Sequence, residues 1–283
     1  MNGVGDDTAT AALPDLSRPI DVSPAAVAEF GDRGHTVIRG LATAEEVAAY
    51  RPAIVETGPK GQYDFRPLEM RDTYGQAFVQ MLNLWVHDHR VRAFVWARRF
   101  AQAAADLLGV DAIRLYHDQA LFKEPGGGFT PWHQDQFYWP LDTAHTITMW
   151  MPLVTITEEM GPMYFASGSH RLGAIRDLPI GDASHEVLSR VVDERGLSRT
   201  GYAPFAPGDA TFHAGWTLHS APPNPSPTMR EVMTIIYYAD GARVGVLDHP
   251  ARRLDRDLWL TGCEPGTLAA GPRNPVLFRR ESG

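Results

Sequence analysis

The spacing of apolar and polar positions predicts helices in the first part of the chain. Ser23 has the pattern of a helix N-cap and Gly34 that of the matching helix end. Thr43 and Glu46 stand at the spacing of a capping box, which predicts a second helix. Two further helical patterns follow within 77–109. We therefore expect a helical N-terminal half.

The pattern changes after residue 109 to short β-branched and aromatic runs separated by Gly, Pro and Asn. These runs cover 111–128, 145–156, 161–170, 208–221 and 229–241. Many short strands punctuated by turns are typical of a β-sandwich or jelly roll. The fold class expected is therefore mostly β, with helices from the N-terminal half packed against the β-core.

Two segments fall outside this pattern. Residues 1–22 show no sustained periodicity, which predicts a flexible N-terminal arm. Residues 173–203 are more polar than the strand runs around them, which indicates a helical insertion or lid. Because no repeat or linker divides the rest, we expect residues 23–283 to form a single domain.

Composition and charge exclude several classes of function. The chain of 283 residues has a formal net charge of −8 and no basic run, which argues against binding to nucleic acid or to anionic membranes. Its one cysteine, Cys263, leaves no intrachain disulfide and no thiolate cluster for a metal. No apolar run approaches a membrane span, and no signal pattern opens the sequence. These features predict a cytoplasmic protein whose partner is a small molecule.

The sequence TPWHQDQFYWP at 130–140 places two ionisable side chains, His133 and Asp135, among aromatic residues. On a strand these two side chains would point to the same face. They could supply two ligands of a two-histidine, one-carboxylate triad, a site typical of non-heme Fe(II). Among the remaining histidines, His219 is the best third ligand, and His213 lies on the same run. Taken alone, such a pair more often reflects a salt bridge or a satisfied core histidine.

Arg230 follows His219 by eleven residues and opens a strand-like run. A guanidinium group near a metal can bind a carboxylate through two hydrogen bonds. A dicarboxylate could then chelate the metal with one end and pair with Arg230 at the other. The alternative is an ordinary surface arginine.

Together these motifs resemble the phytanoyl-CoA dioxygenase family of Fe(II)/2-oxoglutarate oxygenases. The resemblance is carried by WHQD at 132–135, GPMYFASGSH at 161–170, GDATFHAGWTLHSA at 208–221 and Arg230. It extends to 28–47, 116–127 and 264–278, and so covers most of the chain. It implies a double-stranded β-helix, a jelly-roll fold also called cupin-like.

The resemblance also implies the cofactors and a role for each matching residue. Fe(II), 2-oxoglutarate and O₂ are expected, with release of succinate and CO₂. The residues that match the family's iron ligands and pocket positions are His133, Asp135 and His219 for iron, Arg230 for the far carboxylate of 2-oxoglutarate, Gln134 and Trp150 for the co-substrate pocket, and Trp139 for the substrate. Asp118 is a further candidate for holding a polar substrate, with a buried salt bridge as the alternative. Lys123 is expected at a strand end on the surface.

One position departs from the family pattern. Where many members have a serine two residues after the distal histidine, this chain has Ala221. Ser220 or Thr148 could take the place of that serine beside 2-oxoglutarate. The retained Asp135 argues against halogenation, which needs that ligand position for chloride.

The function expected is oxidation of a small natural product in secondary metabolism, by hydroxylation, desaturation, epimerisation or cyclisation. An acyl-CoA substrate would require a basic patch, which the sequence lacks. Two other classes stay open: a non-oxidative, cupin-like metalloenzyme and a catalytically silent binding module.

Overall fold

Two β-sheets face each other in the computed structural model, which describes residues 12–281. The larger sheet has the order β1 (His35–Ile38), β8 (Ala210–Ala214), β5 (Thr146–Pro152), β10 (Val232–Ala239), β3 (Ala112–Phe122) and β11 (Val276–Arg279), with β2 (Val79–Leu82) also paired to β3. The smaller sheet has the order β4 (Thr130–His133), β9 (His219–Ala221), β6 (Tyr164–Ala166) and β7 (Arg199–Gly201). All pairings are antiparallel. The expected jelly-roll arrangement of mostly β-structure is confirmed.

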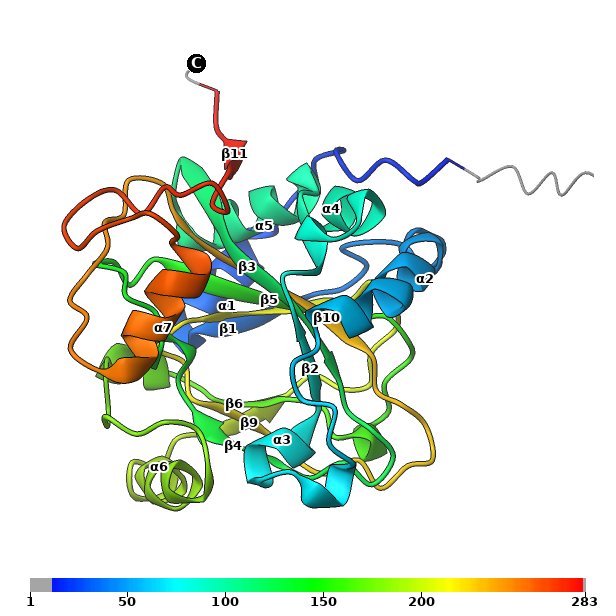
Figure 1. Cartoon of the computed structure of the whole chain (residues 1–283), viewed down its shortest axis with the longest axis vertical. Coiled ribbons are helices and arrows are strands. Elements are labelled where there is room, and N and C mark those ends of the chain that lie inside the picture. The colour runs from blue at the N-terminus through cyan, green and yellow to red at the C-terminus, as the bar shows by residue number, and fades with distance from the viewer. Residues whose placement is uncertain (1–11, 282–283) are drawn as a thin grey trace, which may run out of the picture.

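Helices cover the outer face of the larger sheet (Figure 1). The α-helices are α1 (Pro24–Arg33), α2 (Ala44–Gly61), α3 (Thr73–Ala77), α4 (His89–Val95), α5 (Arg98–Leu108), α6 (Asp182–Glu194) and α7 (Pro250–Trp259). Short 3-10 helices lie at η1 (Leu68–Met70), η2 (Leu84–Val86), η3 (Asp135–Phe137), η4 (Glu158–Met160) and η5 (Ser169–Leu172). The segment 24–108 thus holds five of these α-helices, but it also supplies β1 and β2 to the larger sheet.

The main core fills the space between these helices and the larger sheet. Phe94 of α4 and Phe100 of α5 pack there with Met149 of β5 and Ile235 of β10. Successive side chains of a strand point to opposite faces, so the residues between these apolar positions face the smaller sheet. Because the apolar face of the larger sheet is buried against the helices, polar residues such as Thr148 point into the space between the two sheets.

The predicted helix ends are confirmed where a local capping signal existed. Ser23 accepts a hydrogen bond from the Ala26 amide, and Gly34 ends α1 in the left-handed region. Thr43 and Glu46 form the expected capping box at the start of α2.

The prediction of a flexible arm over 1–22 is wrong for its second part. Leu16 is buried, and its carbonyl accepts a hydrogen bond from the Arg99 amide, while the Tyr50 hydroxyl donates to the Pro14 carbonyl. This stretch packs on α2 and α5 because it buries apolar surface that the periodicity did not reveal. Residues 1–11 lie outside the described residues.

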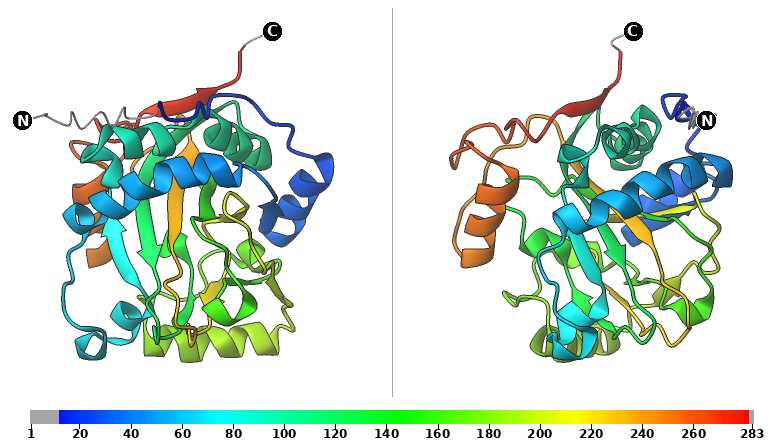
Figure 2. Two further views of the ribbon diagram at one scale, coloured as in Figure 1. Left: turned by 90° about the vertical axis from the view of Figure 1, so that its right-hand side faces the viewer. Right: turned by 45° about the vertical axis from the view of Figure 1, so that its right-hand side comes forward.

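The segment 173–203 contains helix α6 and strand β7. Leu188 and Val192 of α6 pack against Trp132 of β4 and against Leu218, the residue just before β9. Figure 2 shows α6, in yellow-green, along the end of the molecule opposite to the C-terminus. Its function as a lid stays a prediction.

Within residues 12–281, no helix combines the length and the apolar character that crossing a bilayer requires.

Candidate functional site

A cavity of about 410 Å³ lies between the two sheets. The larger sheet contributes Thr148 and Trp150 from β5 and Thr234 from β10 to its wall. The smaller sheet contributes His133 from β4 and His219 from β9. Residues far apart in the sequence therefore meet at one concave site.

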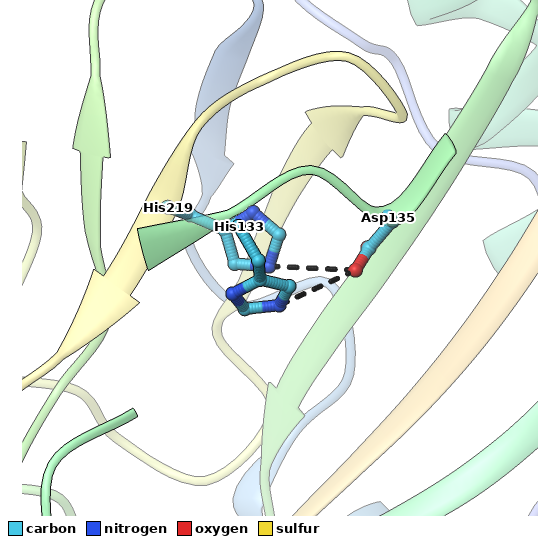
Figure 3. A group of neighbouring side chains, drawn as sticks. All are labelled: His133, Asp135 and His219. Carbon is cyan, nitrogen blue, oxygen red and sulfur yellow. Dashed lines mark ion pairs between the residues drawn. The ribbon is translucent and has the colours of Figure 1, made fainter. Parts of the chain in front are cut away.

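His133, Asp135 and His219 come together in this cavity (Figure 3). Oδ1 of Asp135 lies 3.5 Å from Nε2 of His133 and 3.6 Å from Nε2 of His219. One ligand atom from each residue can be chosen so that all three lie within 4.8 Å of one another. This is a compact group of two imidazoles and one carboxylate, able to hold a metal ion.

The backbone positions this group differently from the sequence expectation. His133 is the last residue of β4, and Asp135 opens the 3-10 helix η3, so the two do not share one strand. His219 opens β9, which pairs with β4 so that His133 and His219 are directly opposed. The turn after β4, and not strand alternation, brings Asp135 back toward both histidines.

Backbone carbonyls orient both imidazole rings. Nδ1 of His133 donates to the Pro131 carbonyl at 2.8 Å, and Nδ1 of His219 donates to the Thr217 carbonyl at 3.0 Å. A carbonyl can only accept, so each Nδ1 carries the proton and each Nε2 is free to bind a metal.

Two residues of the larger sheet hold the second oxygen of Asp135. The Thr148 hydroxyl donates to Oδ2 at 3.1 Å, and Nε2 of His213 lies 3.1 Å from the same atom. Oδ1 is left facing the two histidines, as one-oxygen coordination requires. Thr148 thus contacts the carboxylate ligand, which differs from its expected place beside 2-oxoglutarate.

His213 and His219 reach this point from different sheets. The run FHAGWTLHSA does not form one strand, because a turn separates β8 from β9. His213 therefore approaches from the larger sheet behind Asp135, and its ring centroid lies 4.4 Å from that of His219.

The electrostatics of the group favour metal binding. Burial alone would raise the pKa of Asp135, but the neighbouring imidazoles of His219, His133 and His213 hold this pKa well below its usual range. Burial, together with the neighbouring His133, lowers the pKa of His219 well below its usual range. An ionised carboxylate beside a neutral imidazole is the protonation state that a divalent metal needs.

Arg230 lines the same cavity and is almost completely buried. Its guanidinium group donates to the Gly161 carbonyl and lies 5.5 Å from the centre of the Trp150 ring, while its Nε has no hydrogen-bond partner. Among residues 12–281, no Asp or Glu forms an ion pair with it. Burial lowers the pKa of Arg230 to about 9, so it remains charged at neutral pH. The alternative of a surface arginine is wrong.

The other expected pocket residues divide into two groups. Trp139, Trp150, Thr148 and Ser220 line the cavity. Gln134 does not line the cavity, because its side-chain amide is hydrogen-bonded to backbone groups. Nε2 donates to the carbonyls of Gly173 and Trp216, and Oε1 accepts from the Ile175 amide. The expected contact of Gln134 with the co-substrate therefore has no support in the geometry.

Asp118 is also absent from the cavity wall. Its carboxylate accepts hydrogen bonds from the backbone amides of Leu84 and Trp85, and burial raises its pKa to about 7. The Asp118 side chain points toward the helices. It caps the short helix η2 and does not bind substrate, so the prediction for this residue was wrong. Lys123, expected on the surface, is fully buried.

Cavity residues of α7 were missed by the sequence interpretation. Asp255 and Trp259 line the cavity, with Trp259 stacked on His117 of β3 at 4.7 Å between ring centres. No motif marks the two α7 residues, because α7 is an amphipathic helix far from the strand motifs in the sequence. His117 lies within 116–127, one of the stretches that carry the resemblance.

Comparisons with known proteins agree with this geometry. A model of the phytanoyl-CoA dioxygenase (PhyH) family matches residues 30–232. A probable alpha-ketoglutarate-dependent hypophosphite dioxygenase of Stutzerimonas stutzeri is 27% identical over 226 residues, which are 76% of this chain and 78% of that protein. A methylphosphonate hydroxylase of Gimesia maris is 27% identical over 157 residues, which are 53% of this chain and 54% of that protein.

Two solved structures from nogalamycin biosynthesis are similar over nearly the whole chain. The non-heme alpha-ketoglutarate-dependent epimerase SnoN has a TM-score of 0.73 at 26% identity, covering 90% of this chain and 98% of its own. The carbocyclase SnoK has a TM-score of 0.71 at 27% identity, covering 92% of this chain and 99% of its own. With the family model matching well over half of its residues, the chain belongs to the phytanoyl-CoA dioxygenase (PhyH) family.

Proposed function

We propose that this protein is an Fe(II)- and 2-oxoglutarate-dependent oxygenase. The observation that carries the proposal is the pairing, in one cavity, of a compact two-histidine, one-carboxylate group with a buried arginine that has no acidic partner. The neighbour SnoN has been solved with Fe³⁺ and alpha-ketoglutarate. When bound, Fe(II) and 2-oxoglutarate together with O₂ supply the oxidising power, with release of succinate and CO₂.

Each residue then has a role that follows from its contacts. Nε2 of His133, Nε2 of His219 and Oδ1 of Asp135 are the ligand atoms, and His213 and Thr148 fix the plane of the Asp135 carboxylate. Arg230 binds the far carboxylate of 2-oxoglutarate, which supplies the anion that the buried guanidinium lacks. Trp150 packs on that guanidinium and keeps water from it. Ser220 lines the cavity next to Ala221, where it can contact the co-substrate.

The substrate we propose is a small natural product of secondary metabolism. Epimerase SnoN and carbocyclase SnoK, both from nogalamycin biosynthesis, support this class. The relatives named for hypophosphite and methylphosphonate point to small oxyanions instead. Among the described residues, however, Arg230 is the only Lys or Arg that lines the cavity. With that cation assigned to 2-oxoglutarate, no second one is left for a phosphorus oxyanion, and Trp139 and other aromatic side chains form much of the wall.

The alternatives are less consistent with the site. A non-oxidative metalloenzyme has no use for a buried cation without a partner. A catalytically silent binding module does not need two imidazoles whose Nε2 atoms both face one carboxylate oxygen.

The test is an anaerobic titration of the metal-free protein with Fe(II) and then with 2-oxoglutarate. The native protein should develop the weak visible charge-transfer band of a chelated 2-oxoglutarate, and Arg230→Ala should require a much higher 2-oxoglutarate concentration for it. Arg190→Ala is the matched control, because this arginine of α6 is largely exposed and pairs only with Glu186. Bound iron without any band would contradict the proposal and favour the non-oxidative alternative.

A further inference from the structure

Among the residues that the structure describes, one carboxylate lies in the wall of the cavity apart from the proposed metal ligand Asp135. It belongs to Asp255 of α7, the helix at the left edge of Figure 1. The Tyr116 hydroxyl donates to its Oδ2 at 2.9 Å from behind the wall. His117 and Trp259 lie beside it in the lining, stacked on each other. The cavity thus has an acidic group at its α7 side in addition to the metal-binding group.

Within the described part of the chain, no cation neutralises Asp255. In residues 12–281, no Lys, Arg or His forms an ion pair or hydrogen bond with its carboxylate. Two arginines next to it on α7 pair with other residues, Arg252 with Asp248 and Arg256 with Asp257 and Glu264, and the third, Arg253, is exposed to solvent. His117 does not supply the charge, because burial lowers its pKa to about 4 and leaves the imidazole neutral.

Burying an ionised carboxylate with no cation nearby costs free energy, unless a bound ligand supplies the positive charge. Burial raises the pKa of Asp255 to about 7, against the hydrogen bonds from Tyr116 and Trp259, which act to lower it. A positively charged group bound here would stabilise the ionised form of Asp255. In the same way, the far carboxylate of 2-oxoglutarate would neutralise the buried guanidinium group of Arg230.

The rest of this end of the cavity is aromatic and aliphatic. Leu254, Leu258 and Trp259 of α7 line the cavity around Asp255, and Leu254 and Leu258 remain 58% and 38% exposed. Such exposed apolar side chains beside a cavity are typical of a site that covers an apolar ligand. Flat apolar walls with one acidic group fit a largely apolar, ring-containing molecule that carries a basic amine.

We propose that the substrate is an apolar, ring-containing amine and that Asp255 binds its ammonium group. The inference rests on the proposed oxygenase function only for the statement that the bound molecule is the substrate. The binding site itself is defined by Asp255, Tyr116 and the aromatic wall, independently of iron.

The first test compares two flat probes of the same ring system, one with a charged ammonium group and one with a neutral hydroxyl group. 2-Naphthylmethylamine and neutral 2-naphthylmethanol are titrated into the anaerobic protein loaded with Fe(II) and 2-oxoglutarate, at neutral pH, by calorimetry. The native protein should bind the amine about tenfold more tightly, as expected for one charge-assisted hydrogen bond. Equal affinity for the two probes, or binding of neither, would overturn the proposal without any variant.

Variants then show which residue causes the preference for the amine over the alcohol. Asp255→Asn should bind both probes equally, whereas Asp257→Asn, two residues along the same helix and exposed, should keep the native preference. Tyr116→Phe should also keep it, because the carboxylate remains. A preference that survives in Asp255→Asn would show that another group selects the amine.

The outcome is separable from that of the proposed function. The charge-transfer band is recorded before either probe is added, so its absence contradicts the Fe(II) and 2-oxoglutarate assignment alone. The amine preference can then still be measured on the metal-free protein.

Discussion

The two oxygens of Asp135 have different partners, and this division explains how one carboxylate can serve as a ligand of fixed orientation. Oδ1 faces His133 and His219, while Oδ2 is held by Thr148 and His213. Residues that hold a ligand in place in this way set metal affinity without touching the metal. The structure therefore assigns Thr148 a positioning role.

Replacing Thr148 by valine should weaken Fe(II) binding about tenfold, because the isosteric side chain no longer donates to Oδ2. Fe(II) affinity is measured anaerobically by competition with a chelator, and thermal unfolding checks the fold. Thr211→Val is the matched control, because the buried Thr211 hydroxyl of the neighbouring strand β8 has no hydrogen-bond partner. Native Fe(II) affinity in Thr148→Val would show that His213 alone holds Oδ2.

At the scale of elements, the strand β8 that carries His213 depends on a close approach at its start. Gly208 has φ +89°, and a Cβ added there would lie 2.1 Å from the Ala42 carbonyl oxygen. The Ala42 amide in turn donates to the Gly208 carbonyl at 3.1 Å. This contact joins the turn before β8 to the residue just before the N-cap of α2.

Gly208→Ala should lower the free energy of unfolding by about 3 kcal/mol or more, because backbone must move and φ is unfavourable. Gly40→Ala should cost only about 1 kcal/mol, since Gly40 has φ +62° but open space around its Cα. Urea denaturation of the two variants separates two costs: the positive φ, which both positions share, and the steric overlap with Ala42, which only Gly208 has. Equal losses would mean that the Gly208 turn relaxes freely.

The same scale shows what the sequence could and could not predict. Both ends of α1 and the start of α2 followed from Ser23, Gly34 and Thr43, because capping depends on residues a few positions apart. The metal-binding group was predicted through residue types and the family resemblance, but its geometry was not. A strand that ends at His133 cannot be told from one that continues to Asp135 by composition alone.

Asp118, a candidate for holding a polar substrate, faces away from the cavity for a specific reason. The pairing of β3 with β10 shifts register at Tyr116, which has no partner between Leu115 and His117. Such a bulge inverts the alternation of side chains along the strand. His117 and Gln119 consequently face the cavity, and Asp118 faces the helices. The sequence carries no sign of the bulge, because it depends on β10.

For the whole molecule, the site is assembled from segments that meet only in the folded chain. The proposed ligands come from the smaller sheet and the turn after β4, their supporting residues come from the larger sheet, and the proposed amine-binding residue comes from α7. The burial of two basic side chains is also a property of this assembly: Lys123 and Arg230 occupy paired positions on neighbouring segments. The sequence could not show their burial, because strand-end lysines are usually exposed.

The free energy of unfolding should depend on pH in a way that reveals the lowered pKa of the buried Lys123. Burial lowers the pKa of Lys123 to about 6, with a further contribution from Arg230, against an ordinary value of 10.5. Between these values the unfolded chain binds a proton that the folded chain does not. Stability therefore falls as pH decreases through this range, by at most about 1.4 kcal/mol per pH unit from this group.

Lys123→Met removes this linkage, so its stability relative to the native protein should rise steadily as pH is lowered from about 9 to about 6. The lost hydrogen bond from Nζ to the Gly128 carbonyl adds a constant offset that leaves the slope unchanged. Lys60→Met, at the exposed end of α2, replaces the other lysine of the chain and should follow the native profile. Urea denaturation at several pH values gives all three curves. Parallel curves for Lys123→Met and the native protein would mean that Lys123 keeps its proton when buried, stabilised by groups that the fold brings to it.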